Sequence, residues 1–104
     1  MFPLMPLTKK KEIAATVDAI AAEFQPKVRR IRWEIGKDWY GDPALFLRIL
    51  LADSATKGRR LALIANAVQR QIHDKLTPDE FGLYPYCSFR SESEQEELQD
   101  KDWA

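Results

Sequence analysis

The stretch VRRIRWEIGKDWYGDPALFLRILLAD, residues 28–53, predicts two strands joined by a loop. In its first part Ile31, Trp33 and Ile35 alternate with charged residues, the period-two pattern of a strand buried on one side. Residues 44–51 are apolar at nearly every position, so we expect the second strand to be central or packed on both faces. The connecting loop, GKDWYGDP, is rich in the turn formers glycine, aspartate and proline. The rest of the chain is expected to cover this hairpin.

Two segments with helical spacing flank the hairpin. The first has an apolar stripe at Ile13, Val17, Ile20 and Phe24. The second has its stripe at Leu61, Ile64, Ala65, Val68, Ile72 and Leu76. The segment Thr77–Glu80 then resembles a capping box with proline at the first helical position, and a third strand is expected over Leu83–Arg90.

This order predicts an α+β fold: helix, strand, strand, helix, strand. Two helices on one face of a three-stranded, mostly antiparallel sheet would bury both helical stripes. The direction of the third strand stays open. The expected core consists of Ile13, Val17, Ile20, Phe24, Ile31, Trp33, Leu47, Ile49, Ile64, Val68, Ile72 and Phe89.

The composition indicates one globular domain followed by a different kind of segment. The chain has 104 residues, of which 45% are hydrophobic and 31% charged, and its formal net charge is zero. Residues 1–90 are expected to form the domain. Residues 91–104 are strongly acidic and hold few apolar side chains, so we expect a mobile tail, or a helix that forms only on docking. Its notable residues are Glu92, Glu94, Glu96, Glu97 and Trp103.

Several observations favour a cytoplasmic protein without a membrane partner. The longest apolar run, residues 44–52, is interrupted by Arg48 and is too short to span a bilayer. Residues 1–7 are apolar but lack a basic start and a following cleavage site, so no signal peptide is expected. Cys87 is the only cysteine, which excludes an internal disulfide and fits a reducing compartment.

The sheet face that the helices leave uncovered is the main candidate for a binding surface. Alternation along the strands assigns to it Arg30, Arg32, Glu34, Phe46, Arg48, Leu50, Tyr86, Ser88 and Arg90. Arginine and aromatic side chains are typical of protein interfaces, and they also suit single-stranded RNA, whose bases stack on rings while guanidinium groups meet phosphate. The remaining interpretations are a homodimer formed sheet to sheet, or the chain's own acidic tail folded over the arginines.

The hairpin loop is a second candidate. Asp38, Trp39, Tyr40 and Asp42 place two carboxylates beside two aromatic rings, an arrangement that could form the edge of a ligand or metal site. No histidine or third acid lies nearby in the sequence to complete a metal site. The alternative is a plain hairpin end on which Trp39 packs against the sheet.

Features of an enzyme are sparse. His73 is the only histidine and has no serine or cysteine near it in sequence, and Cys87 falls on the apolar side of the third strand. The four glycines all fall at expected turns or helix ends, so no phosphate-binding loop is indicated. We therefore expect no catalytic residue, no metal and no cofactor.

The turn Asp38-Trp39, with Gly41–Ala44, and the strand end Phe89–Ser91 resemble short prokaryotic proteins encoded beside HEPN-domain proteins, in toxin–antitoxin or defence-type pairs. The resemblance implies a small partner of a toxin or effector, plausibly its antitoxin or an accessory protein. An acidic tail anchored by Trp103 would then occupy the basic groove of a ribonuclease. The element order also resembles KH-like folds, but the Gly-x-x-Gly clamp of that family is absent, which weakens the RNA interpretation.

Overall fold

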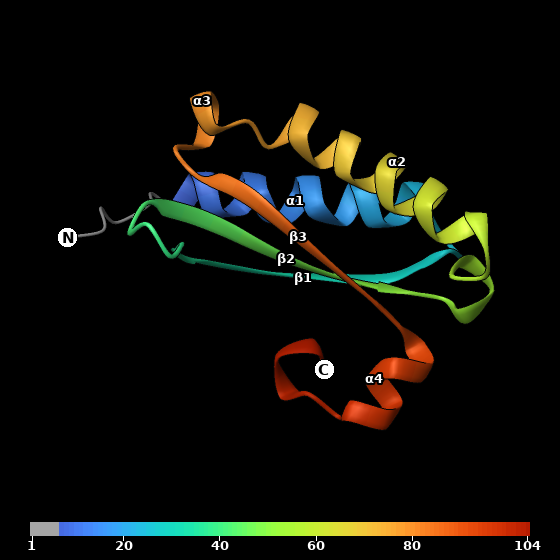
Figure 1. Ribbon diagram of the computed structural model, residues 1–104. Helices are drawn as coiled ribbons and strands as arrows, with labels where there is room; N and C mark the ends of the chain where they lie inside the picture. Colours follow the sequence, from blue (N-terminus) through green and yellow to red (C-terminus); the bar gives the residue numbers. More distant parts are fainter. Residues whose placement is uncertain (1–6) are drawn as a thin grey trace.

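The computed structural model describes residues 7–104 and has the predicted order of elements, helix, strand, strand, helix, strand, with four further short helical segments within that range (Figure 1). The expectation that the first residues form no signal peptide falls largely outside the described range. The elements are α1 (Leu7–Glu23), β1 (Val28–Lys37), β2 (Pro43–Leu51), η1 (Asp53–Ala55), α2 (Arg59–Lys75), α3 (Pro78–Phe81), β3 (Tyr84–Ser91), α4 (Glu92–Leu98) and η2 (Lys101–Trp103).

The sheet has the order β1-β2-β3, with β2 in the centre. β1 and β2 pair antiparallel across the hairpin, whereas β2 and β3 pair parallel. The sheet is thus mixed rather than mostly antiparallel, and the strand direction that the sequence left open is settled. The reason is the crossover: α2 returns the chain to the end of the sheet where β2 began, so β3 runs in the same direction as β2.

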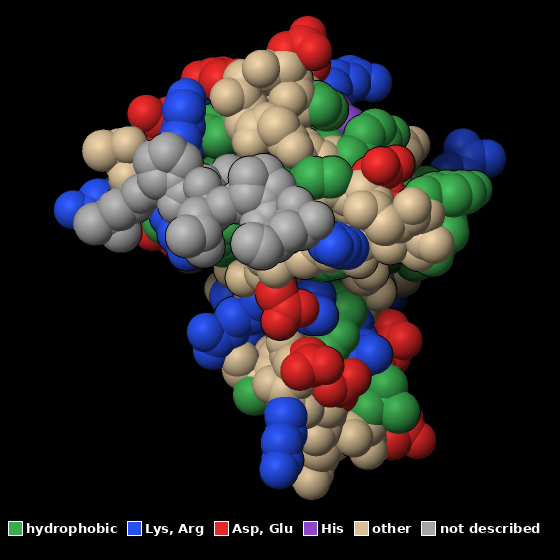
Figure 2. Space-filling view, turned by 90° about the vertical axis from the view of Figure 1, so that its left-hand side faces the viewer, with side chains coloured by type: hydrophobic (Ala, Val, Ile, Leu, Met, Phe, Trp, Pro, Cys, Tyr) green, Lys and Arg blue, Asp and Glu red, His purple; other side chains and the backbone are tan. Residues whose placement is uncertain are grey.

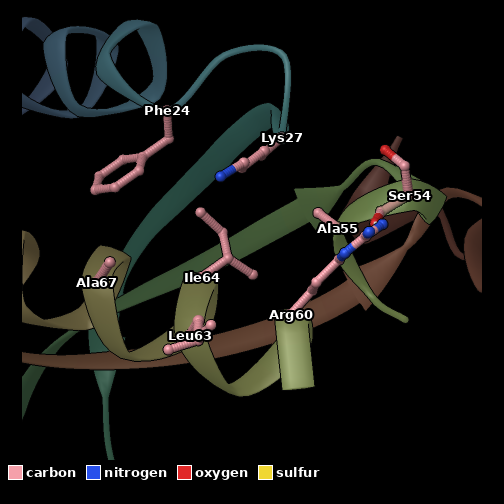
Figure 3. A pocket seen from close by; sticks show the side chains of 8 residues that line it. All are labelled: Phe24, Lys27, Ser54, Ala55, Arg60, Leu63, Ile64 and Ala67. Carbon is pink, nitrogen blue, oxygen red and sulfur yellow. The ribbon is translucent and has the colours of Figure 1, made fainter. Parts of the chain in front are cut away.

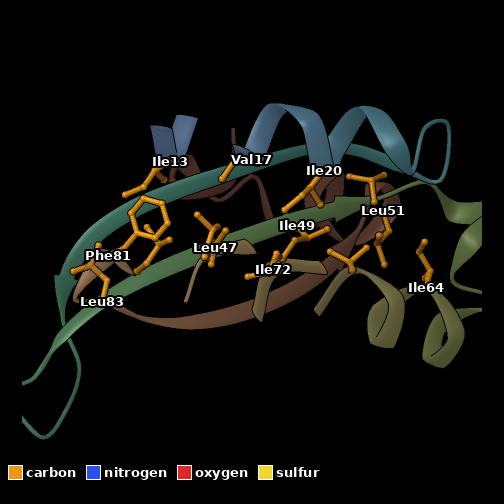
Figure 4. Close-up of a cluster of buried hydrophobic side chains, with 14 of the residues drawn as sticks. Ile13, Val17, Ile20, Leu47, Ile49, Leu51, Ile64, Ile72, Phe81 and Leu83 are labelled. Carbon is orange, nitrogen blue, oxygen red and sulfur yellow. The ribbon is translucent and has the colours of Figure 1, made fainter. Parts of the chain in front are cut away.

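Helices α1 and α2 lie side by side on one face of the sheet and bury their apolar stripes against it (Figure 1). The predicted core is confirmed. Figure 4 shows side chains of β2 pointing toward those of the two helices, and the shared cluster includes Ile13, Val17, Ile20, Leu47, Ile49, Ile64, Val68 and Ile72. Phe24, Ile31, Trp33 and Phe89 are partly buried and pack against this cluster.

The short helix before β3 forms as the sequence predicts. The Thr77 hydroxyl accepts a hydrogen bond from the Glu80 amide at 3.3 Å, and Pro78 occupies the start of α3. Gly82 ends the helix with φ = 70°, a left-handed conformation that glycine adopts without strain. This turn fixes the entry of β3 beside β2.

Residues 92–104, hereafter the C-terminal segment, are folded rather than extended as a mobile tail. They form α4 and η2 and lie across the sheet on the side opposite α1 and α2 (Figure 1). The expectation of a mobile tail rested on the low apolar content of this segment. That argument left out the buried Trp103 and the ion pairs that the sheet's arginines offer. No helix within residues 7–104 combines the length and hydropathy that a membrane crossing requires.

Candidate functional site: the open face of the sheet

The strand register places every residue predicted for the uncovered surface on one face of the sheet, hereafter the open face. Three neighbouring strands contribute one residue each to a row across this face. From one end to the other the rows are Arg30, Leu50 and Arg90; Arg32, Arg48 and Ser88; Glu34, Phe46 and Tyr86; and Gly36, Ala44 and Tyr84. The first row lies near the start of β1, and the last lies beside the hairpin loop.

The C-terminal segment covers the first row. The Arg30 Nη2 atom donates a hydrogen bond to the Trp103 carbonyl oxygen at 2.7 Å. The Arg90 guanidinium lies 4.3 Å from the centre of the Trp103 ring, in a cation–π contact. Leu50 is only 6% exposed and Trp103 only 7%. In this row the chain's own acidic segment folds back over the arginines, which is one of the alternatives that the sequence left open.

Polar contacts hold the C-terminal segment at both of its ends. Arg90 also meets the Asp100 carboxylate at 3.5 Å and the Gln95 side-chain oxygen at 2.9 Å. At the start of α4 the Ser91 hydroxyl and the Glu94 carboxylate form a reciprocal capping box. Next to it, Asp53 accepts hydrogen bonds from the Ser93 hydroxyl at 2.6 Å and the Ser93 amide at 3.0 Å. These bonds hold the pKa of the Asp53 carboxyl below its ordinary value.

The acidic residues predicted to contact a partner differ in their contacts: two of them bond within the chain and two are exposed to solvent. Glu92 pairs with Arg29 at 3.2 Å, and Glu94 caps its own helix. Glu96 and Glu97 remain exposed. Figure 2 shows basic and acidic side chains mingled where the C-terminal segment meets the body of the molecule. Glu92 and Glu94 therefore bond to groups of the chain itself, whereas Glu96 and Glu97 face solvent.

The hairpin loop is organised by the carboxylate of Asp38. Its Oδ1 atom accepts hydrogen bonds from the Tyr40 amide at 2.9 Å and the Asp42 amide at 3.0 Å. Its Oδ2 atom accepts a hydrogen bond from the Tyr86 hydroxyl at 2.8 Å. Burial raises the pKa of Asp38, but the hydrogen bonds outweigh it and the net pKa lies below 3.8. The same bond, together with burial, raises the pKa of Tyr86 to about 12.

Replacing Asp38 by alanine is expected to loosen the loop. The amides of Tyr40 and Asp42 lose their acceptor, so their hydrogen exchange should accelerate about tenfold. Exchange measured by NMR tests this, with the Phe81 amide, bonded to the Thr77 carbonyl in α3, as an internal reference. Unchanged exchange at both amides would show that the carboxylate does not order the loop.

The pKa of Asp38 also gives the sign of a pH effect on the same variant. Because its folded pKa lies below 3.8, the charged form stabilises the fold at neutral pH, and this contribution is lost as the pH falls through the folded value. Between about pH 5 and about pH 2.5 the wild type should therefore lose more thermal stability than Asp38→Ala. Equal losses would contradict the assignment.

Five aromatic side chains form a connected group at the loop end of the open face, hereafter the aromatic cluster. Its members are Trp39, Tyr40, Phe46, Tyr84 and Tyr86. Ring centres are 5.7 Å apart for the stacked pair Phe46 and Tyr86, 5.2 Å for Trp39 and Tyr86, 5.9 Å for Trp39 and Tyr40, and 5.0 Å for Tyr84 and Tyr86. Trp39 is 73% exposed and Tyr40 is 78% exposed. The expectation that Trp39 packs on the sheet is met only at its contact with Tyr86.

Gly36 makes room for one ring of this cluster. A side chain at this position would come within 3.3 Å of the Phe46 ring, which is tighter than an ordinary contact. The bare backbone of β1 therefore lets the Phe46 ring lie against it and stay stacked on Tyr86. This glycine serves packing at the cluster in addition to marking the end of the strand.

The charges around the aromatic cluster are mixed. Arg48 pairs with Glu34 at 3.2 Å across the strands. Arg32 is exposed and forms no ion pair with another described residue. Asp38 and the exposed Asp42 lie in the adjoining loop. Three carboxylates thus stand beside two guanidinium groups.

The residues weighed for catalysis are not themselves part of the open face, although His73 on α2 contacts Tyr84, a member of the aromatic cluster. His73 meets Tyr84 edge to face, with ring centres 5.9 Å apart. Cys87 lies on the helix-covered face, where burial raises the pKa of its thiol to about 11 and keeps it protonated at neutral pH. Within residues 7–104, no group of three or more histidine, cysteine, aspartate or glutamate side chains could hold a metal ion.

Comparison with protein-family models, with curated proteins and with solved structures finds no match to this chain. The site is therefore interpreted from its own geometry. Sequence reasoning found most of the open face but missed Tyr84. Alternate residues of a strand share a face, so Tyr84, two residues before Tyr86, could have been assigned to it. Sequence reasoning also missed the Asp53–Ser93 contact, for which no local pattern gives a signal.

Proposed function

We propose that this protein is a binding module and that its partner, another protein, docks on the aromatic cluster. The observation that carries the proposal is the exposure of Trp39 and Tyr40, at 73% and 78%, on a loop that Asp38 holds in place. Large aromatic rings held rigidly in water are typical of binding hot spots, because they bury much area at little entropic cost. Isolated exposed rings need no explanation, but a connected cluster of five does.

Charge favours a protein over RNA as the partner. An RNA strand needs cations beside the stacking rings to meet its phosphates. Beside the aromatic cluster, Arg48 is already paired with Glu34, and Asp38 and Asp42 would repel phosphate. A mixed set of charges around an apolar centre instead matches the polar rim of a protein interface. Single-stranded RNA remains the alternative partner, to be distinguished by experiment.

The covered row supplies a model for how the partner would bind. In that row Arg90 already contacts an aromatic ring, that of Trp103, and a carboxylate, that of Asp100. The neighbouring row offers the same chemistry through the exposed Arg32. We expect the partner to place an apolar anchor on the aromatic cluster and a carboxylate on Arg32.

Several features support binding rather than catalysis. Cys87 is a protonated, half-buried thiol, and His73 is engaged with the Tyr84 ring. His73 belongs to α2, and Cys87 lies on the helix-covered face of the sheet. We therefore propose a protein without enzymatic activity.

We propose the partner's identity from the resemblance to short proteins encoded beside HEPN-domain proteins. On that basis the partner is a toxin or effector, and this chain is its antitoxin or an accessory protein in the cytoplasm. The C-terminal segment is engaged on the chain's own sheet, so it reaches a partner's groove only by leaving the first row. The aromatic cluster needs no such release and is the primary contact in this proposal.

A pull-down from native cells tests the proposal. The tagged protein and its Trp39→Ala variant are used as baits, with and without ribonuclease, and the bound proteins are identified by mass spectrometry. The matched control is Leu63→Ala, which removes an equally exposed apolar side chain from α2, on the other side of the sheet. We expect one stoichiometric protein with the wild type and the control, resistant to ribonuclease and depleted with Trp39→Ala.

The other outcomes separate the alternatives. Recovery of RNA without such a protein would favour the RNA-binding interpretation. Equal recovery of a protein with Trp39→Ala would remove the aromatic cluster as its contact. A captured protein that arrests growth when expressed alone, and is silenced by this chain, would support the toxin assignment.

A homodimer on the open face would differ from the one that the sequence suggested. A sheet-to-sheet dimer would need the apolar residues of the open face, and one of them, Leu50, is only 6% exposed. Self-association would therefore have to use the aromatic cluster instead. Sedimentation of the purified chain as a dimer that Trp39→Ala converts to a monomer would replace the proposed partner with a second copy.

A further inference from the structure

A pocket opens on the helix-covered side of the molecule, far from the aromatic cluster. It has a volume of about 370 Å³ and lies where the end of α1, the turn η1 and the start of α2 meet. Figure 3 shows its lining side chains, which come from the connection between α1 and β1, from η1 and from α2. The C-terminal segment lies on the opposite side of the sheet and does not cover it (Figure 1). The volume is that of a pocket for a small molecule.

The lining divides into an apolar part and a basic part. The apolar side chains are Phe24, Ala55, Leu63, Ile64 and Ala67. The charged ones are Lys27 and Arg60, and no acidic residue contributes to the lining. Leu63 is 70% exposed although it lies at this pocket, so apolar surface is left open to solvent here.

Two cations line the pocket, Lys27 and Arg60. The Arg60 Nη1 atom donates a hydrogen bond to the Ser54 carbonyl oxygen at 3.3 Å, which holds the guanidinium beside the turn η1. Lys27 extends from the segment between α1 and β1 toward the same space (Figure 3). Within the described residues, neither cation forms an ion pair. Two cations without a neutralising acid leave the pocket with an excess of positive charge.

We propose that this pocket binds a small amphipathic carboxylate. Its apolar body would lie between Phe24, Leu63 and Ala67, and its anionic group would contact Lys27 and Arg60. The proposal rests on complementarity: an apolar wall favours burial of hydrocarbon, and lining cations without an acidic partner favour an anionic head group over a neutral one. It is independent of the proposed protein partner, because the two sites are on opposite sides of the sheet.

Titration with octanoate, followed by NMR shifts of backbone amides, tests this proposal. 1-Octanol serves as the neutral counterpart with the same chain length. We expect saturable shifts at the amides of Phe24, Lys27, Ser54 and Ala67. Because both charged contacts are partly exposed to solvent, octanoate should bind about tenfold more tightly than octanol.

Three variants separate the roles of charge and space. The double substitution of Lys27→Gln and Arg60→Gln should weaken octanoate about tenfold and leave octanol unchanged. Arg70→Gln, an exposed cation further along α2, is the matched control and should change neither. Ala67→Phe places a ring in the pocket and should abolish binding of both compounds. Since Ala67 is only partly buried at the surface of α2, this variant should still fold.

The result that overturns the proposal is specific. Equal affinity for octanoate and octanol, with no effect of the double substitution, would show an apolar pocket without recognition of the anion. Shifts confined to residues outside the lining would show that the pocket is not the binding site.

Discussion

Trp39→Ala is expected to weaken binding of the protein partner about 30-fold, equivalent to about 2 kcal/mol. The indole is the most exposed large apolar group of the aromatic cluster apart from Tyr40, and it is held against Tyr86 with ring centres 5.2 Å apart. Because Asp38 orders the loop before any partner arrives, little conformational entropy is lost when the ring is buried. A preorganised aromatic anchor of this kind typically dominates the energy of an interface.

The measurement is a titration of the purified partner by calorimetry. Trp39→Phe should retain part of the affinity, since it keeps an aromatic ring on Tyr86. Leu63→Ala, on the other side of the sheet, should bind as the wild type does. Because Trp39 is mostly exposed, its loss should change the free energy of unfolding by no more than about 0.5 kcal/mol. A loss of affinity below twofold would place the interface elsewhere.

Trp103→Ala is expected to lower the free energy of unfolding by about 2 kcal/mol. The side chain is 7% exposed and lies under the Arg90 guanidinium, and Leu50, the strand neighbour of Arg90, is 6% exposed. Removal of the Trp103 side chain is expected to uncover the first row, because the ring no longer holds in place the backbone carbonyl of residue 103, which accepts a hydrogen bond from the Arg30 guanidinium. The value is below that for a tryptophan in a protein core, because the C-terminal segment can detach while the sheet and helices stay folded.

Chemical denaturation and hydrogen exchange measure this effect. Exchange should accelerate at the amides of residues 92–104 more than at those of β2. The matched control is Leu98→Ala in the same segment, which removes a side chain that is 60% exposed and should have little effect. Equal stability of the two variants, with equal exchange over residues 92–104, would show that Trp103 does not anchor the segment.

Trp103→Ala also bears on partner binding, because the C-terminal segment and the aromatic cluster lie on the same face of the sheet. Detachment of the C-terminal segment would uncover Arg30, Leu50 and Arg90, which continue the surface begun by the aromatic cluster. If a partner uses only the cluster, Trp103→Ala should leave its affinity unchanged. If the partner competes for the first row, Trp103→Ala should raise its affinity. The proposed contact at Trp39 is the same in both cases.

The sequence alone determined the layers of this protein. Period-two alternation in β1 and near-continuous apolar residues in β2 identified the strands, and spacings of three and four identified the faces that α1 and α2 bury. The same alternation assigned nine residues to the open face, and the register places all nine there. These predictions succeed because side-chain direction is set locally, by the pleat of a strand or the turn of a helix.

The tertiary structure decided what no local pattern contains. The parallel course of β3 depends on where α2 returns the chain. The fold of residues 92–104 depends on Arg29 and Arg30, which lie far away in sequence, and on the nearby Arg90. A composition argument treats the acidic segment as if it had to bury apolar surface by itself. In the structure the Trp103 side chain is buried, and Arg90 meets both the indole ring and Asp100. Ordering of this segment is offset by contacts from the sheet, and those contacts exist only once the three strands are in register.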